Sequence, residues 1–142
     1  MKGKYFLDTN ILVYTFDPSD RKKRDTARDL VNGALADNQG LISWQVVQEF
    51  LNVARRKFAT PLSPEDCRLY LRQVLAPLCE VFPSIDLYQR ALEIHERENF
   101  SYYDSLIVAA ADEAGCRTLF TEDLREGSLA SGLAIRNPFR SA

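Results

Sequence analysis

Residues 4–14, KYFLDTNILVY, place a carboxylate between two apolar runs. The apolar residues 5–7 are typical of a short buried strand, and a helix over about residues 10–16 is predicted to follow directly. Burying an ionised carboxylate is costly unless the group has a partner. The segment therefore predicts a strand that ends at Asp8, and the role of this acid has to be explained.

Short apolar segments alternate with helical patterns along most of the chain. Strands are predicted near residues 4–7, 41–42, 80–82, 118–120 and 134–136, and helices over about 10–16, 20–37, 44–58, 64–75, 85–98 and 101–114. Strands that alternate with helices favour a mostly parallel sheet covered by helices on both faces. We therefore expect an α/β fold, and the absence of a repeat or linker favours one domain over residues 1–142.

Helix boundaries are also visible in the sequence. Residues that cap helices well stand at five predicted starts: Asp20, Ser43, Ser63, Ser84 and Ser101. Asn38 and Gly40 have the turn chemistry that ends a helix, and Gly115 is a typical stop residue. Pro77 is expected to end the fourth helix near residue 75.

The overall composition is that of a soluble globular protein, with 46% apolar and 27% charged residues. The net charge of −2 argues against a protein that coats nucleic acid by charge alone. Three scattered cysteines without metal-binding spacing favour reduced thiols in the cytoplasm. No apolar run approaches the roughly 18 residues of a membrane span, so no membrane association is expected.

Two acids are predicted to lie at the same edge of the sheet. Asp8 directly follows the first strand, and Asp123 follows the strand at 118–120. Ligands of open α/β sheets bind beyond the carboxyl ends of the strands, where both side chains would lie. The alternative is local: Asp8 can cap a helix, and Asp123 can stabilise a turn.

Two further acids lie unusually close to apolar helix faces. Asp104 shares its face with Ile107 and Ala111, although it can also complete a capping box behind Ser101. Glu49 has valines three residues before it and four residues after it, although it can also pair with Arg56 as a boundary residue.

Four converging carboxylates would repel one another. At roughly 5 Å and an effective dielectric constant of about 20, each pair costs on the order of 3 kcal/mol. Such a cluster needs protonation or a cation, and oxygen ligands favour the hard ions Mg²⁺ and Mn²⁺. The single histidine and isolated cysteines give no zinc spacing. We therefore expect one or two Mg²⁺ or Mn²⁺ ions.

Four segments resemble the PIN-domain family, and within it the VapC-type toxins of prokaryotic toxin–antitoxin pairs: FLDTNILVY, QVVQEFLNV, YYDSLIVAAA and LFTEDL. The resemblance implies that Asp8, Glu49, Asp104 and Asp123 form the acidic active site and bind the metal. It implies that Asn10 orients these acids and that Thr121 assists, whereas Thr9 receives no role. The implied fold is a mostly parallel sheet sandwiched by helices.

The resemblance further implies a metal-dependent endoribonuclease that is a homodimer and is held inactive by a cognate antitoxin. Water activated by the metal would leave 5′-phosphate and 3′-hydroxyl ends. Candidate RNA contacts are Arg21, Lys22, Lys23, Arg24, Arg55, Arg56, Lys57, Tyr102 and Tyr103. The basic residues can equally form solvated helix faces, and the tyrosines can be packing residues.

Other functions stay open on the sequence. The chain can be a PIN-domain nuclease of RNA processing without an antitoxin. It can also be a non-catalytic metal-binding or structural interaction domain, in which the acids are caps and rim residues. A receiver-type signalling domain is disfavoured, because no second acid stands beside Asp8 and no lysine follows the 118–120 strand.

Overall fold

The computed structural model describes residues 3–140, and its strands form one six-stranded sheet. The strands are β1 (Tyr5–Leu7), β2 (Gly40–Ser43), β3 (Cys79–Val81), β4 (Thr118–Phe120), β5 (Gly127–Ser128) and β6 (Ala134–Arg136). The helices are α1 (Thr9–Tyr14), α2 (Arg21–Asp37), α3 (Trp44–Arg56), α4 (Pro64–Tyr70), the π-helical turn η1 (Leu71–Leu75), α5 (Ala76–Leu78), α6 (Ile85–Glu98) and α7 (Tyr102–Glu113).

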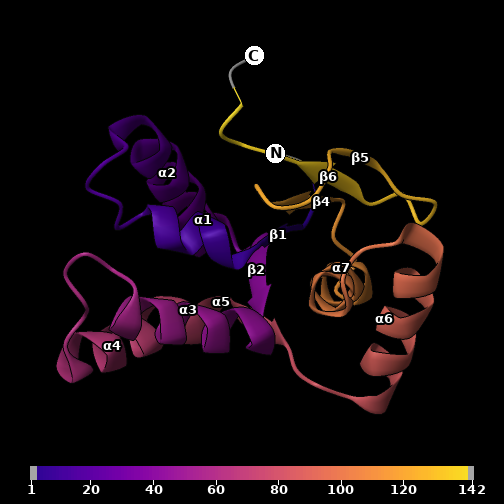
Figure 1. Ribbon diagram of the computed structural model, residues 1–142, viewed down its shortest axis with the longest axis horizontal. Coiled ribbons are helices and arrows are strands. Elements are labelled where there is room, and N and C mark those ends of the chain that lie inside the picture. Colours follow the sequence, from indigo (N-terminus) through magenta and orange to yellow (C-terminus); the bar gives the residue numbers. More distant parts are fainter. Residues whose placement is uncertain (1–2, 141–142) are drawn as a thin grey trace.

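Helices cover both faces of this mostly parallel sheet, which confirms the predicted fold class. Helix α2 packs on β2 from one side, whereas α7 packs on β2 and β4 from the other and is itself covered by α6 (Figure 1). Helices α1 and α3 pack against each other at one end of the sheet. Among the described helices, none is long and apolar enough to cross a membrane.

Strand β1 lies in the middle of the sheet, whose order is β3-β2-β1-β4-β6-β5. It pairs in parallel with β2 on one side and with β4 on the other. The chain thus leaves β1 toward one flank and returns to the opposite flank, and ligands of α/β sheets bind at such a switch point. Leu7 is paired with Phe120, so the chain emerges from the two strands side by side at Asp8 and Thr121.

The predicted helix starts are correct, and their caps explain why. Asp20, Ser63, Ser84 and Ser101 each accept a backbone N–H of the first turn through the side chain. Ser43 stands at the start of α3 but makes no such bond. Asn38 ends α2 in the left-handed conformation at φ 59°, which a short polar side chain tolerates.

Gly40 is required by close packing at the start of β2. A Cβ atom at this position would lie 2.3 Å from the Cβ of Ala34 and 2.7 Å from the ring of Tyr5. The glycine therefore lets α2 and β1 approach β2 closely, and this holds the central strand in place.

The prediction that Pro77 ends the fourth helix near residue 75 is wrong, because helical structure continues to Leu78. The chain passes through the π-helical turn η1, in which the Ala76 N–H donates to the Leu71 carbonyl five residues back. Pro77 then lies in the first turn of α5, where its missing N–H costs little.

Strand β5 was not predicted, because its two residues are exposed and carry no apolar pattern. The three cysteines are free thiols, as expected.

Candidate functional site

Asp8 lies at the centre of the site, directly beyond β1. Its backbone N–H donates to the Phe120 carbonyl, which extends the pairing of β1 with β4 by one residue. Its side chain caps α1 by accepting the Thr9 N–H at 2.7 Å on Oδ1 and accepts the Thr121 hydroxyl at 2.7 Å on Oδ2. Asp8 is therefore both the helix cap and the buried acid that the sequence left as alternatives, with only 6% of its surface exposed.

The environment of Asp8 disfavours its charged form. Burial is the main cause that raises the pKa of this carboxyl from 3.8 to about 7, and the negative charges of Glu49 and Asp123 add to the effect. Hydrogen bonds from Thr121 and Thr9 act in the opposite direction without cancelling it. The site thus holds a carboxylate that a nearby cation would stabilise strongly.

Asn10 and Thr121 connect Asp8 to Asp123. The Asn10 amide Nδ2 donates to Asp123 Oδ2 at 3.1 Å and to Thr121 Oγ1 at 3.3 Å. The Asp123 N–H donates to Thr121 Oγ1 at 3.1 Å, and the Thr121 hydroxyl in turn donates a hydrogen bond to Asp8 Oδ2. This network gives Asn10 and Thr121 the orienting geometry that the resemblance implies.

Glu49 reaches the site from α3 and is held by two residues that the sequence analysis missed. The Thr9 hydroxyl donates to Glu49 Oε1 at 2.6 Å, and the Gln45 amide donates to Oε2 at 3.2 Å. Gln45 also donates to the Tyr103 carbonyl at 3.1 Å, so it joins α3 to the first turn of α7. The alternative for Glu49, a pair with Arg56, is not present among the ion pairs of residues 3–140.

The sequence contained only weak indications that Thr9 and Gln45 would contact Glu49. Gln45 lies one helical turn before Glu49, which places both on the same face, but a glutamine on a helix is ordinarily solvated. Its burial, with 9% of its surface exposed, is visible only in the structure. Thr9 follows a capping residue, and its position offers no sequence pattern of its own.

Asp104 is the fourth predicted acid and stands in the first turn of α7. Its backbone N–H donates to the Ser101 hydroxyl at 3.1 Å, so the cap is formed. The Gln45 bond to the preceding carbonyl, that of Tyr103, brings the start of α7 beside α3. The Asp104 side chain is partly exposed and makes no hydrogen bond or ion pair within the described residues.

An open hollow of about 510 Å³ lies at this edge of the sheet. Thr9, Asn10, Glu49 and Asp123 contribute to its lining, together with Tyr14 and Glu122. Within residues 3–140, no group of three or more His, Cys, Asp or Glu side chains is gathered closely enough to hold a metal ion. Two of the predicted acids, Glu49 and Asp123, act electrostatically on Asp8, but the three do not form a closed cage.

The donor chemistry nevertheless fits a hard divalent ion. The groups around the hollow offer carboxylate, amide and hydroxyl oxygens, with no sulfur or imidazole among the site residues. Mg²⁺ keeps several of its waters and binds through one or two carboxylates, so it does not need a complete protein cage.

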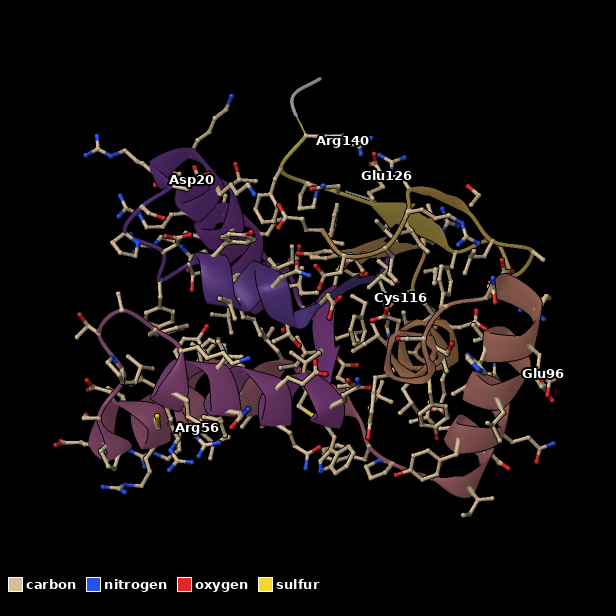
Figure 2. The ribbon with its side chains drawn as sticks, in the orientation of Figure 1. Asp20, Arg56, Glu96, Cys116, Glu126 and Arg140 are labelled. Atoms are coloured by element: carbon tan, nitrogen blue, oxygen red, sulfur yellow. The ribbon has the colours of Figure 1, made fainter. Side chains whose placement is uncertain are left out.

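The predicted RNA contacts fall in three places. Lys23 lies beside the site, but its ammonium is bound to Glu122 Oε2 at 2.6 Å. Arg55, Arg56 and Lys57 are exposed at the end of α3, and Figure 2 shows Arg56 on the side of α3 away from α1. Tyr103 is 67% exposed and packs edge-on against Tyr102 next to Asp104.

The sequence profile of the PIN domain family matches residues 5–129. The chain belongs to the PIN domain family. The match spans every predicted acid of the site, which agrees with the sequence resemblance. No curated protein is similar enough to this PIN domain to count as a match.

Solved structures with the same fold include toxin–antitoxin proteins. A toxin–antitoxin complex from Klebsiella pneumoniae has 20% sequence identity and a TM-score of 0.67, with 95% of this chain and 98% of that chain covered. FitAcB from Neisseria gonorrhoeae has 18% identity and a TM-score of 0.63, with coverage of 96% and 99%. The sarcin-ricin-loop-cleaving toxin VapC20 from Mycobacterium tuberculosis has 20% identity and a TM-score of 0.60, with coverage of 84% and 92%. At these identities the similarity establishes the shared PIN fold.

Proposed function

We propose that this PIN domain is a divalent-metal-dependent endoribonuclease that acts as the toxin of a VapBC-type pair. The observation that supports it most is the state of Asp8, a buried carboxyl with a pKa raised to about 7 beside two further acids. Burial makes the charged form of this carboxyl costly, and a bound cation would offset that cost.

Asp8, Asp123 and Glu49 would hold Mg²⁺ or Mn²⁺, with Asp104 as the ligand supplied by α7. When bound, such an ion activates water for attack on phosphate and offsets the negative charge that develops there. One or two ions are consistent with this set of acids. The expected products are RNA fragments with 5′-phosphate and 3′-hydroxyl ends.

The residues around these acids keep them in place. Thr121 and the Thr9 N–H hold the two oxygens of Asp8, and Asn10 fixes Asp123 relative to both. The Thr9 hydroxyl and Gln45 hold the two oxygens of Glu49. Every acid except Asp104 is thus oriented before an ion arrives, and such preorganisation lowers the cost of binding.

RNA would approach along basic side chains of two helices. Arg21 and Lys22 are exposed at the start of α2 and Arg24 is partly buried there, and Arg55 to Lys57 are exposed at the end of α3. These groups would offset the repulsion between phosphates and the acidic site. Tyr103 is exposed beside Asp104 and offers a face on which an unpaired base can stack.

The partners follow from the toxin assignment. Structures with this fold are described as toxin–antitoxin complexes, including the one from Klebsiella pneumoniae. We propose a cognate antitoxin for this chain, a homodimeric toxin and a cytoplasmic location, where RNA is accessible. An arginine of the antitoxin that enters the acidic hollow would compete with the metal.

The test compares expression of the wild type with Asp8→Asn and with the control Asp29→Asn, an exposed acid of α2. The wild type and the control should arrest growth and produce cleaved cellular RNA with 5′-phosphate ends. Asp8→Asn should lose more than about 100-fold in cleavage, since it removes a metal ligand rather than a supporting residue. Equal cleavage by all three proteins would contradict the nuclease assignment. RNA cleavage without growth arrest would instead support an RNA-processing PIN nuclease.

A further inference from the structure

Glu122 follows Thr121 in the loop after β4, and both of its carboxylate oxygens are held by other elements. Lys23 of α2 binds Oε2 at 2.6 Å, and the Tyr14 hydroxyl of α1 donates to Oε1. Lys23 Nζ also lies 3.4 Å from the Tyr14 hydroxyl. The three side chains therefore join two helices to the loop that carries Asp123.

Two aromatic rings cover part of this ion pair. Lys23 Nζ lies 4.7 Å from the ring centre of Tyr14 and 5.6 Å from that of Phe139, and the two rings pack edge-on at 4.9 Å. The C-terminal segment that supplies Phe139 also carries Arg140, which forms an ion pair with Glu126 at 2.9 Å, and Figure 2 shows the two residues side by side. The Lys23 and Glu122 side chains keep only 31% and 25% of their surfaces exposed.

This partial cover distinguishes the pair from an ordinary surface salt bridge, which contributes little to a structure. The hydrogen bond to Glu122 is the main cause that raises the pKa of Lys23. The Lys23 ammonium already has Glu122 Oε2 at 2.6 Å and the Tyr14 hydroxyl at 3.4 Å as partners, so it is not free to neutralise a phosphate.

The backbone of Glu122 connects this pair to the acids. The Glu122 N–H donates to Asn10 Oδ1 at 3.3 Å, which orients the Asn10 amide. The same amide donates to Asp123 Oδ2 and to Thr121, the partner of Asp8. A shift of Glu122 would therefore misplace Asn10 and Asp123 together.

We propose that Lys23 is a positioning residue of the active site, which acts through Glu122 and Asn10 on Asp123 rather than by contacting RNA. The inference rests on the proposed function. It replaces the phosphate contact that the sequence suggested for Lys23, whereas Lys22 remains a candidate for that contact.

The direction in which Lys23→Met changes Mn²⁺ affinity distinguishes a positioning role of Lys23 from a purely electrostatic effect of its charge. Lys23→Met removes a cation near the acids, so simple electrostatics predicts tighter Mn²⁺ binding. Positioning predicts the opposite: we expect about tenfold weaker Mn²⁺ binding, as for residues that orient metal ligands. Titration calorimetry of the RNA-free protein with Mn²⁺ measures this without relying on catalysis. Arg68→Met on α4, an exposed arginine with the same charge loss, should leave the affinity unchanged.

Kinetics and a double mutant complete the test. Lys23→Met should lower kcat by about tenfold with little change in KM, whereas Lys22→Met should raise KM and weaken the salt dependence. Glu122→Gln should resemble Lys23→Met, and the double variant should be no worse than either, because both act through one contact. Tyr14→Phe removes the other hydrogen bond to Glu122 without creating a cavity. It therefore provides a second test of whether Glu122 positions the acids if Lys23→Met does not fold.

Two outcomes would overturn the inference. One is unchanged or tighter Mn²⁺ binding by Lys23→Met together with a raised KM, which would make Lys23 an RNA contact. The other is fully additive losses in the double variant. A wild-type protein that neither binds Mn²⁺ nor cleaves RNA would contradict the proposed function itself. An active wild type, together with a Lys23→Met variant whose Mn²⁺ affinity and kcat are unchanged, would contradict only the positioning role.

Discussion

Asp8 shows how a single residue can serve the fold and the site at once. It caps α1 through Oδ1 and accepts the Thr121 hydroxyl through Oδ2. The cap was readable in the sequence because it acts between neighbours in the chain. The hydrogen bond to Thr121 joins residues 113 positions apart, and no local sequence pattern predicts it.

The raised pKa of Asp8 predicts a pH dependence of stability. A carboxyl whose pKa rises from 3.8 unfolded to about 7 folded binds its proton more tightly in the native state. The tighter proton binding therefore stabilises the folded state fully below about pH 4, and this stabilisation is lost as the pH rises to about 7. The loss reaches up to about 4 kcal/mol, since one pKa unit corresponds to about 1.4 kcal/mol.

Urea unfolding in a chelator at pH 5 and pH 8 measures this effect. The wild type should lose more stability between these values than Asp8→Asn, in which position 8 no longer titrates. Other groups titrate in both proteins, so the comparison isolates Asp8. Parallel loss of stability in the two proteins would show that Asp8 is not perturbed.

At the scale of elements, the site is assembled by contacts between helices that the chain separates widely. Thr9 of α1 binds Glu49 of α3, and Gln45 of α3 binds the first turn of α7. Most of the predicted helices were correct because their caps and apolar periodicity are local. Their mutual contacts were missed because Thr9 and Gln45 gain their roles only when three helices meet.

Replacement of Gln45 should test this junction. Gln45→Leu removes the bonds to Glu49 and to the Tyr103 carbonyl, and a lost buried hydrogen-bond partner costs about 1–3 kcal/mol. Mn²⁺ affinity should fall as well, because Glu49 loses one of its two supports. The control is Gln48→Leu, an exposed glutamine of the same helix. Thermal unfolding and calorimetry with Mn²⁺ check the result, and equal behaviour of both variants would contradict it.

At the scale of the whole molecule, the negative net charge requires RNA to be guided by local basic surfaces. The double variant Arg21→Gln and Lys22→Gln should bind RNA more weakly. Its slope of log affinity against log salt concentration should be lower in magnitude by up to about 0.7 per lost phosphate contact. The matched double variant Arg68→Gln and Arg72→Gln removes the same charge on α4 and η1 and should leave the slope unchanged. Filter binding over a range of salt concentrations measures both. Identical slopes for the two double variants would argue against a role for the start of α2.

The topology explains why the acids could be found without a structure. Asp8 and Asp123 were predicted to share an edge because parallel strands present their carboxyl ends together, and the central position of β1 between β2 and β4 places both at the switch point. Glu49 and Asp104 were found from their place on apolar helix faces and from the resemblance. Glu49 and Asp123 line one hollow and act electrostatically on Asp8, and the role of all four acids as metal ligands stays a prediction.

Patterns between neighbouring residues were sufficient to locate every strand except β5, most helices and the candidate acids, since apolar periodicity, caps and strand ends act over a few positions. The fold alone decided which side chains support those acids. Thr9, Gln45 and the Lys23–Glu122 pair bind partners that lie on other elements or after other strands. Such pairings depend on how strands and helices are stacked in space, and a one-dimensional pattern does not encode that arrangement residue by residue.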